Sequence, residues 1–101
     1  QVFKWIKAKN RWERRAAAVI LIPGVRRGKF LVEIFKTSNV LLKDEDDLVR
    51  KGYGWALKEA SNVFPSEVFD FVMKNREQMP RVALRYAIEK MPMEWKREAM
   101  K

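Results

Sequence analysis

Residues 44–60 read DEDDLVRKGYGWALKEA, and this stretch decides the fold. At about 100° per residue, its apolar and small residues gather on one side of a helix. They are Leu48, Val49, Gly52, Tyr53 and Ala56. Lys51, Trp55 and Lys58 lie within about 60° of one another, at one border of that side. The stretch therefore predicts an amphipathic helix that opens at the acids Asp44 and Asp47, which suit a positive helix end, and finishes near residue 60.

The rest of the chain also indicates helices. Asn10 and Glu13 have the spacing of a capping box, and the helix that they open is expected to reach Ile22, where Pro23-Gly24 stops it. Further helices are expected over about 29–38, 65–75 and 80–91, and a last short one begins at Pro92. No stretch alternates for long like an exposed strand. The expected fold class is all-α, with about six helices.

A weak internal repeat links three of these helices. Segments 11–17, 47–53 and 81–87 each place a basic residue three positions after an apolar one, followed by small or aromatic residues. The basic positions are Arg15, Lys51 and Arg85, separated by 36 and then 34 residues. Paired helices at such a period are typical of an α-solenoid, in which each unit buries its apolar face against the next. We therefore expect a single HEAT-like repeat domain of antiparallel helix pairs over residues 1–101, with these cations on one surface.

The composition limits the classes of function. The 101 residues carry a net charge of +9 and include neither cysteine nor histidine. A disulfide framework, a Cys/His zinc site, a thiolate nucleophile and a histidine base are therefore excluded. No apolar run approaches the roughly 18 residues of a membrane span, and no signal-peptide pattern is present. We expect a cytoplasmic protein without metal or cofactor; its charge favours nucleic acid, although an acidic protein or membrane surface fits the same number.

The N-terminus resembles the middle of a longer protein. The chain begins at Gln1, without methionine, and enters an amphipathic stretch at once, with apolar residues at Val2, Phe3 and Ile6. A shortened solenoid exposes the apolar face that its missing neighbour covered. We therefore expect a C-terminal fragment that self-associates through the Val2 to Ile6 region.

Two groups of residues are candidates for binding a ligand. In the first, Trp55 stands between Lys51 and Lys58. Either Trp55 is a core residue with solvated lysines beside it, or its face packs on a nucleotide while the cations neutralise phosphates. Gly52 and Gly54 each cost roughly 1 kcal/mol of helix propensity against alanine. That cost indicates close approach by another helix or by a ligand backbone.

The second group is a basic loop before the second helix: Arg26, Arg27 and Lys29. Cations at a helix N-terminus oppose the helix dipole, which is a reason to expect a role in ligand binding; a solvated loop is the alternative. Two further side chains are expected to be structural. Arg14 is expected to face water or to pair with Glu13 or an upstream acid, and Glu59 to be a partly buried, paired carboxylate.

These motifs together resemble a known family. Segment 51–59, KGYGWALKE, is similar to the G-W-x-L-R-E signature of the DNA alkylation repair enzymes of AlkD type. Residues 10–17 resemble that family's N-x-W-x-x-R-x-A helix, and residues 85–88 its late R-x-A-I-K helix. Order and spacing agree over essentially all of the chain, which is identified as the C-terminal part of such an enzyme.

The resemblance implies an alkylpurine DNA glycosylase that releases N3-methyladenine and N7-methylguanine from duplex DNA by hydrolysis of the N-glycosidic bond, in base excision repair. Unlike most glycosylases, such enzymes need not swing the lesion into a deep pocket. Trp55 matches one of the family's cleft tryptophans, and Arg15 matches the arginine of the upstream DNA-facing helix. Lys58 replaces an arginine, which keeps the charge but loses the bidentate fork. The family's catalytic aspartate belongs to a helix before Val2, so no catalytic residue is expected here.

Eight residues are therefore predicted to bind duplex DNA with alkylated bases: Arg15, Arg26, Arg27, Lys29, Lys51, Trp55, Lys58 and Arg85. Two other functions fit the same pattern. One is a non-catalytic relative that recognises branched or distorted DNA. The other is a helical-repeat scaffold that binds an acidic protein.

Overall fold

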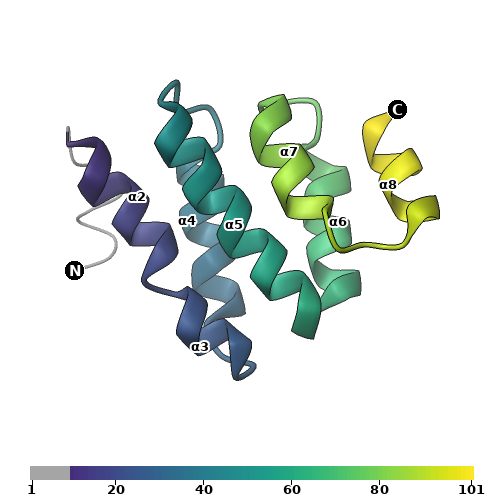
Figure 1. Ribbon diagram of the computed structural model, residues 1–101, viewed down its shortest axis with the longest axis horizontal. Coiled ribbons are helices and arrows are strands. Elements are labelled where there is room, and N and C mark those ends of the chain that lie inside the picture. The colour runs from purple at the N-terminus through teal and green to yellow at the C-terminus, as the bar shows by residue number, and fades with distance from the viewer. Residues whose placement is uncertain (1–9) are drawn as a thin grey trace.

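The computed structural model describes residues 10–101, and within them it shows an array of helices without strands (Figure 1). The helices are α2 (Arg11–Val19), α3 (Ile22–Arg26), α4 (Leu31–Leu41), α5 (Asp47–Val63), α6 (Pro65–Asn75), α7 (Arg81–Ile88) and α8 (Met93–Met100). Over this range the all-α fold class is confirmed, with six helices of eight residues or more and the five-residue α3. The region expected to self-associate, Val2 to Ile6, lies outside the described residues.

The helices form two layers across the shortest dimension of a molecule measuring 37 × 29 × 17 Å. Figure 1 shows α2, α5 and α7 side by side and running in one direction in the nearer layer, with α4 and α6 behind them. The short α3 continues from α2, and α8 lies beyond α6 and α7 at the C-terminal end. This arrangement of antiparallel neighbours agrees with a helical-repeat fold.

Helix α5 is the centre of the core. It packs against α2, α3, α4, α6 and α7. The largest fully buried side chain is its Tyr53, whose hydroxyl donates a hydrogen bond of 2.8 Å to the carbonyl oxygen of Leu42. Fully burying one large apolar side chain stabilises a fold by about 1.5–3 kcal/mol. The buried Val49 and Leu57 add to Tyr53, so the amphipathic stretch that opened the sequence forms the structural axis.

Side-chain caps start two helices. Asn10 accepts a hydrogen bond from the backbone N–H of Trp12 (2.8 Å), which confirms the predicted start of α2. At α5 the cap is Asp46, which accepts from the N–H groups of Leu48 and Val49, and not Asp44 or Asp47 as expected. An acid directly before the helix reaches the first free N–H groups, whereas Asp47 already lies within the first turn.

The prediction of one continuous helix from Asn10 to Ile22 was wrong. Helix α2 ends at Val19, and Pro23 lies in the first turn of α3. Proline has no N–H group to donate to the carbonyl four residues earlier, so the helix cannot continue through it, but a first turn tolerates it. Gly24 stops nothing and lies inside α3. A Cβ atom there would come within 2.1 Å of the Phe30 ring, so the glycine makes room for that ring.

Three other boundaries differ from the expected ones. Helix α4 begins at Leu31 because Phe30, with φ at +67°, adopts a left-handed conformation that interrupts the helix, and α4 then runs on to Leu41. Helix α5 continues three residues beyond residue 60. Helix α7 is shorter than expected and ends at Ile88, whereas α6 has the expected bounds.

Candidate nucleic-acid interface

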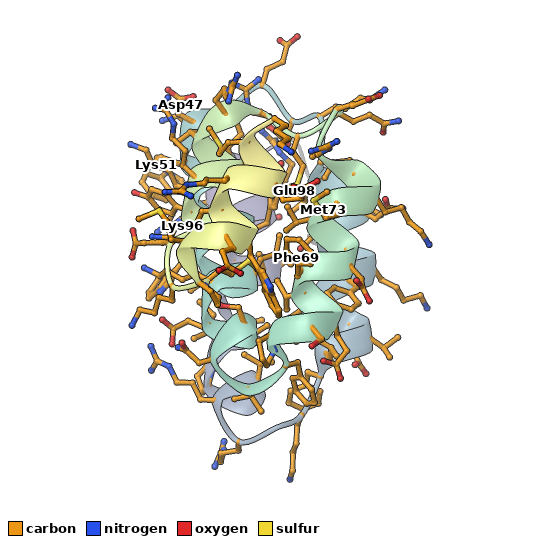
Figure 2. All side chains as sticks on the ribbon, turned by 90° about the vertical axis from the view of Figure 1, so that its right-hand side faces the viewer. Asp47, Lys51, Phe69, Met73, Lys96 and Glu98 are labelled. Atoms are coloured by element: carbon orange, nitrogen blue, oxygen red, sulfur yellow. The ribbon has the colours of Figure 1, made fainter. Side chains whose placement is uncertain are left out.

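The side-by-side packing of α2, α5 and α7 gathers the three repeated cations on one layer of the molecule. Arg15, Lys51 and Arg85 each lie on a different one of these helices. Figure 2 shows Lys51 at the edge of the molecule, on the side opposite Phe69 and Met73 of α6. We call the surface of α2, α5 and α7 that carries these three cations the basic face.

Arg15 is held against the start of α5. Its Nη1 atom donates a hydrogen bond of 2.8 Å to the carbonyl oxygen of Leu48. A Cβ atom on Gly52 would lie 3.0 Å from the Arg15 Cγ atom, so the glycine allows the arginine stem to cross α5 closely. The carbonyl is a neutral acceptor and uses one N–H group of the guanidinium. The positive charge of Arg15 is therefore oriented but not neutralised by this contact.

Lys51 and Arg85 are the free cations of the basic face. Lys51 is partly buried and Arg85 is exposed. Neither side chain forms an ion pair or hydrogen bond with another residue of the range 10–101. The two ammonium and guanidinium groups are therefore available to an anion from outside.

Trp55 is partly buried and packs against the hydrophobic core. It lies on α5 one turn after Lys51 and one turn before Lys58. Behind it, a Cβ atom on Gly54 would approach the Tyr86 Cβ atom to 2.9 Å and the Ala83 carbonyl oxygen to 3.1 Å. The close approach that the two glycines of α5 indicate is thus made by neighbouring helices. Trp55 thus contributes to the core, as the first interpretation holds, and keeps part of its surface exposed; packing of that part on a nucleotide stays a prediction.

Lys58 is tied to α7. Its Nζ atom lies 3.4 Å from a carboxylate oxygen of Glu89 and 5.7 Å from the centre of the Tyr86 ring. The lysine side chain is only 18% exposed. A phosphate that binds Lys58 has to compete with Glu89, which makes this residue a weaker candidate than Lys51.

Of the three cations that were predicted in a loop, Arg26 is instead the last residue of α3 and is paired, whereas the other two lie beyond that helix. Arg26 Nε lies 2.8 Å from Glu59 Oε1, and that carboxylate is 12% exposed. The hydrogen bond from Arg26 outweighs the opposing effect of burial and holds the pKa of Glu59 below its ordinary value, with nearby Lys58 and Lys90 acting in the same direction. Glu59 is therefore the paired structural carboxylate that the sequence indicated.

Arg27 and Lys29 are exposed and form no side-chain pair within residues 10–101. They flank Gly28, whose φ of +80° turns the chain between α3 and α4. The loop thus presents two cations to solvent beyond the end of α3. The structure brings them near the α5 end that carries Glu59, and not into the row of Arg15, Lys51 and Arg85.

Several interactions had no signal in the sequence. Arg14 pairs at 2.8 Å with Asp44, thirty residues later, an acid that the sequence did not point to. Near Lys58 lie Tyr86 of α7 and Glu89, which directly follows that helix, both about thirty residues later in the sequence. The sequence repeat predicts that α5 and α7 lie side by side, but it does not predict which of their side chains are in contact.

Two other features are absent from the described part of the chain. No helix in residues 10–101 is long and apolar enough to cross a membrane. No group of three or more histidine, cysteine, aspartate or glutamate side chains is arranged to hold a metal ion in that same range.

Comparison with known proteins identifies the family. The family model described as "DNA alkylation repair enzyme" matches residues 1–91. No curated protein and no solved structure gives a match. The matched range includes α2 to α7, and with them Arg15, Lys51, Trp55 and Arg85. Because the match covers nine-tenths of the sequence, the chain belongs to the DNA alkylation repair enzyme family.

Proposed function

We propose that this chain binds the backbone of duplex DNA through the basic face, as part of an alkylpurine DNA glycosylase. The observation that carries the proposal is the row of Arg15, Lys51 and Arg85 on three parallel neighbouring helices. Two of these cations, Lys51 and Arg85, have no partner within residues 10–101. A solenoid that repeats one cation per unit matches a polyanion that repeats one phosphate per nucleotide. The resemblance to the AlkD-type enzymes supports alkylated duplex DNA as the substrate.

The members of the row have different parts in binding. Lys51 and Arg85 neutralise phosphates and release counterions. Arg15 presents an oriented guanidinium, because its bond to the Leu48 carbonyl fixes one edge of the group and leaves other N–H donors. Trp55 packs its exposed part on a sugar or base between these contacts.

Other cations extend the contact outside the row. Arg27 and Lys29 reach the backbone beyond the end of α3. Arg26 and Lys58 contribute less, since Glu59 and Glu89 already oppose their charges. Catalysis is assigned to no residue of this chain, and hydrolysis of the glycosidic bond is proposed for the enzyme that also contains the family's catalytic aspartate.

The experiment that tests the proposal is a salt titration of binding to a fluorescent duplex. Wild type is compared with the double variant Lys51→Gln/Arg85→Gln and with Lys74→Gln, a matched control at an exposed lysine of α6. Each phosphate contact contributes about 0.9 to the slope of log affinity against log salt. The double variant is therefore expected to reduce the slope by about 1.8, while Lys74→Gln leaves it within about 0.3 of wild type.

Two results separate the competing functions. If Lys51→Gln/Arg85→Gln and Lys74→Gln reduce the slope equally, binding follows net charge alone and the basic face has no special role. If the variants spare DNA but abolish binding to an acidic protein, the chain is a scaffold. Comparing an intact duplex with a four-way junction distinguishes the glycosylase from a relative that recognises branched DNA, because only the latter favours the junction.

A further inference from the structure

A pocket of about 280 Å³ lies at the C-terminal end, between the connection from α6 to α7 and the end of α8. Its charged walls include Arg76, Glu77 and Arg81, and its apolar part includes Met79 and Leu84. Pockets for drug-sized ligands begin at roughly 300 Å³. This pocket therefore suits a small group, such as one phosphate with its attached sugar.

Both guanidinium groups of the pocket have neutral acceptors. Arg76 Nη1 donates to the carbonyl oxygen of Glu98 at 2.5 Å, and Arg81 Nη1 lies 3.8 Å from the Met100 sulfur atom. Neither arginine forms an ion pair within residues 10–101. The Lys101 ammonium, also at the pocket, is paired with the Glu98 carboxylate at 3.2 Å.

The charge of the pocket is consequently not balanced. Glu77 carries the one side-chain carboxylate among its lining residues, against two guanidinium groups without an ion pair in residues 10–101. Arginine presents several N–H donors in a fixed planar fork, a geometry that matches phosphate oxygens. A thioether and a backbone carbonyl use few of those donors.

We propose that this pocket binds a phosphate group through Arg76 and Arg81, with the apolar wall of Met79 and Leu84 beside the sugar. Arg81 lies one helical turn before Arg85 on the same helix, a rise of about 6 Å. The pocket thus lies about one turn along α7 from the Arg85 end of the row, between α7 and α8. The favoured occupant is a phosphate of the DNA backbone that the basic face binds, and this choice rests on the proposed function. The proposal that the pocket binds a phosphate group does not rest on it.

Two probes test the pocket and its occupant: inorganic phosphate, and an unmodified 16-base-pair duplex. The side-chain Nε–H resonances of arginine are followed by NMR during both titrations. Arg81→Gln is the main variant, because it leaves the Arg76 bond to Glu98 intact. Arg97→Gln removes the same charge from an exposed site on α8 and is the matched control. Thermal melts verify that each variant is folded.

The expected result is saturable shifts of the Arg76 and Arg81 resonances with both probes. Loss of one phosphate contact weakens duplex binding about 5–10-fold at 0.1 M salt for Arg81→Gln, against less than about 2-fold for Arg97→Gln. Equal effects of the two variants on DNA, together with saturable shifts by inorganic phosphate, assign the pocket to a free phosphate. Absence of saturable shifts with either probe overturns the proposal. A wild-type chain that does not bind DNA refutes the proposed function, and the inorganic phosphate titration still decides the pocket.

Discussion

Substituting Gly54 by alanine adds one methyl group where α5 and α7 approach each other closely. The new Cβ atom would meet the Tyr86 Cβ atom at 2.9 Å and two backbone atoms of Ala83 at 3.1 and 3.2 Å. Backbone atoms cannot rotate away as the end of a side chain does. Gly54→Ala is therefore expected to push α7 away from α5, which also moves Arg85 relative to Lys51.

The magnitude follows from two opposing effects. Replacing glycine by alanine inside a helix stabilises the fold by about 1 kcal/mol. Overpacking a tight contact costs about 1–3 kcal/mol. The net loss for Gly54→Ala is thus about 1 kcal/mol, or a decrease in Tm of about 4–8 °C for a domain of this size.

Gly52→Ala, two residues earlier, is the informative partner. Its Cβ atom would meet the Arg15 Cγ atom at 3.0 Å, and the two next nearest atoms, also of Arg15, at 3.7 Å. The arginine side chain can shift by the few tenths of an ångström that are needed. The gain in helix propensity then offsets the contact, and Tm is expected to stay within about 3 °C of wild type.

The assay is thermal unfolding followed by circular dichroism, with Asn62→Ala as a control for helix propensity at an exposed position of α5. A Tm for Gly54→Ala at or above that of wild type would refute the reasoning, because it would mean that α7 does not depend on this close approach. Equal decreases in Tm for Gly52→Ala and Gly54→Ala would also contradict it. They would mean that a contact with a movable side chain costs as much stability as a contact with fixed backbone atoms.

Two further predictions concern single buried contacts. Tyr53→Phe leaves the Leu42 carbonyl oxygen without its hydroxyl donor and is expected to cost about 1–2 kcal/mol in urea unfolding at pH 7. Because burial raises the pKa of Tyr53, wild type is also expected to lose stability as the pH rises above the ordinary tyrosine value of 10.0, and Tyr53→Phe to lose less; parallel pH profiles would disprove this. Glu59→Gln removes the charged hydrogen bond to Arg26 and, allowing for the exposure of that arginine, is expected to cost about 1 kcal/mol at pH 7. Since the pKa of Glu59 is lowered in the folded protein, this stabilising contribution is present above pH 4.5, the ordinary pKa, and disappears as the pH falls below it. The Tm values of Glu59→Gln and wild type are therefore expected to converge between pH 6 and 3. Tm values that stay apart would count against the pairing.

The elements of the fold were predictable because they depend on local pattern. The period of apolar residues in α5 and the proline at the start of α6 fixed those two helices to within three residues. The predicted helix boundaries were wrong where a single residue determines the backbone conformation. Pro23 divides a continuous pattern in two, and Phe30 adopts a left-handed conformation that no propensity of phenylalanine favours, while its ring fills the space above Gly24.

The sequence predicted on which helices the candidate cations lie, but not which of them form ion pairs. The repeat placed Arg15, Lys51 and Arg85 on adjacent helices, as observed. It could not show that Arg26 and Lys58 meet carboxylates 33 and 31 residues away in the sequence. Such pairs depend on how helices stack and on rotamers, neither of which is encoded in the spacing of residues along one helix.

This division of the cations has a consequence for how a solenoid face recognises DNA. If the proposed function holds, each unit contributes one cation to the row, so removing one contact weakens DNA binding by a similar factor wherever it lies. The positions of the cations depend instead on the helix spacing, which Gly52 and Gly54 set from the centre of the row. A methyl group on Gly54 alters the distance between Lys51 and Arg85 without touching either charge. In the proposed function, the fit of the basic face to the DNA backbone therefore depends on core packing as much as on surface charge.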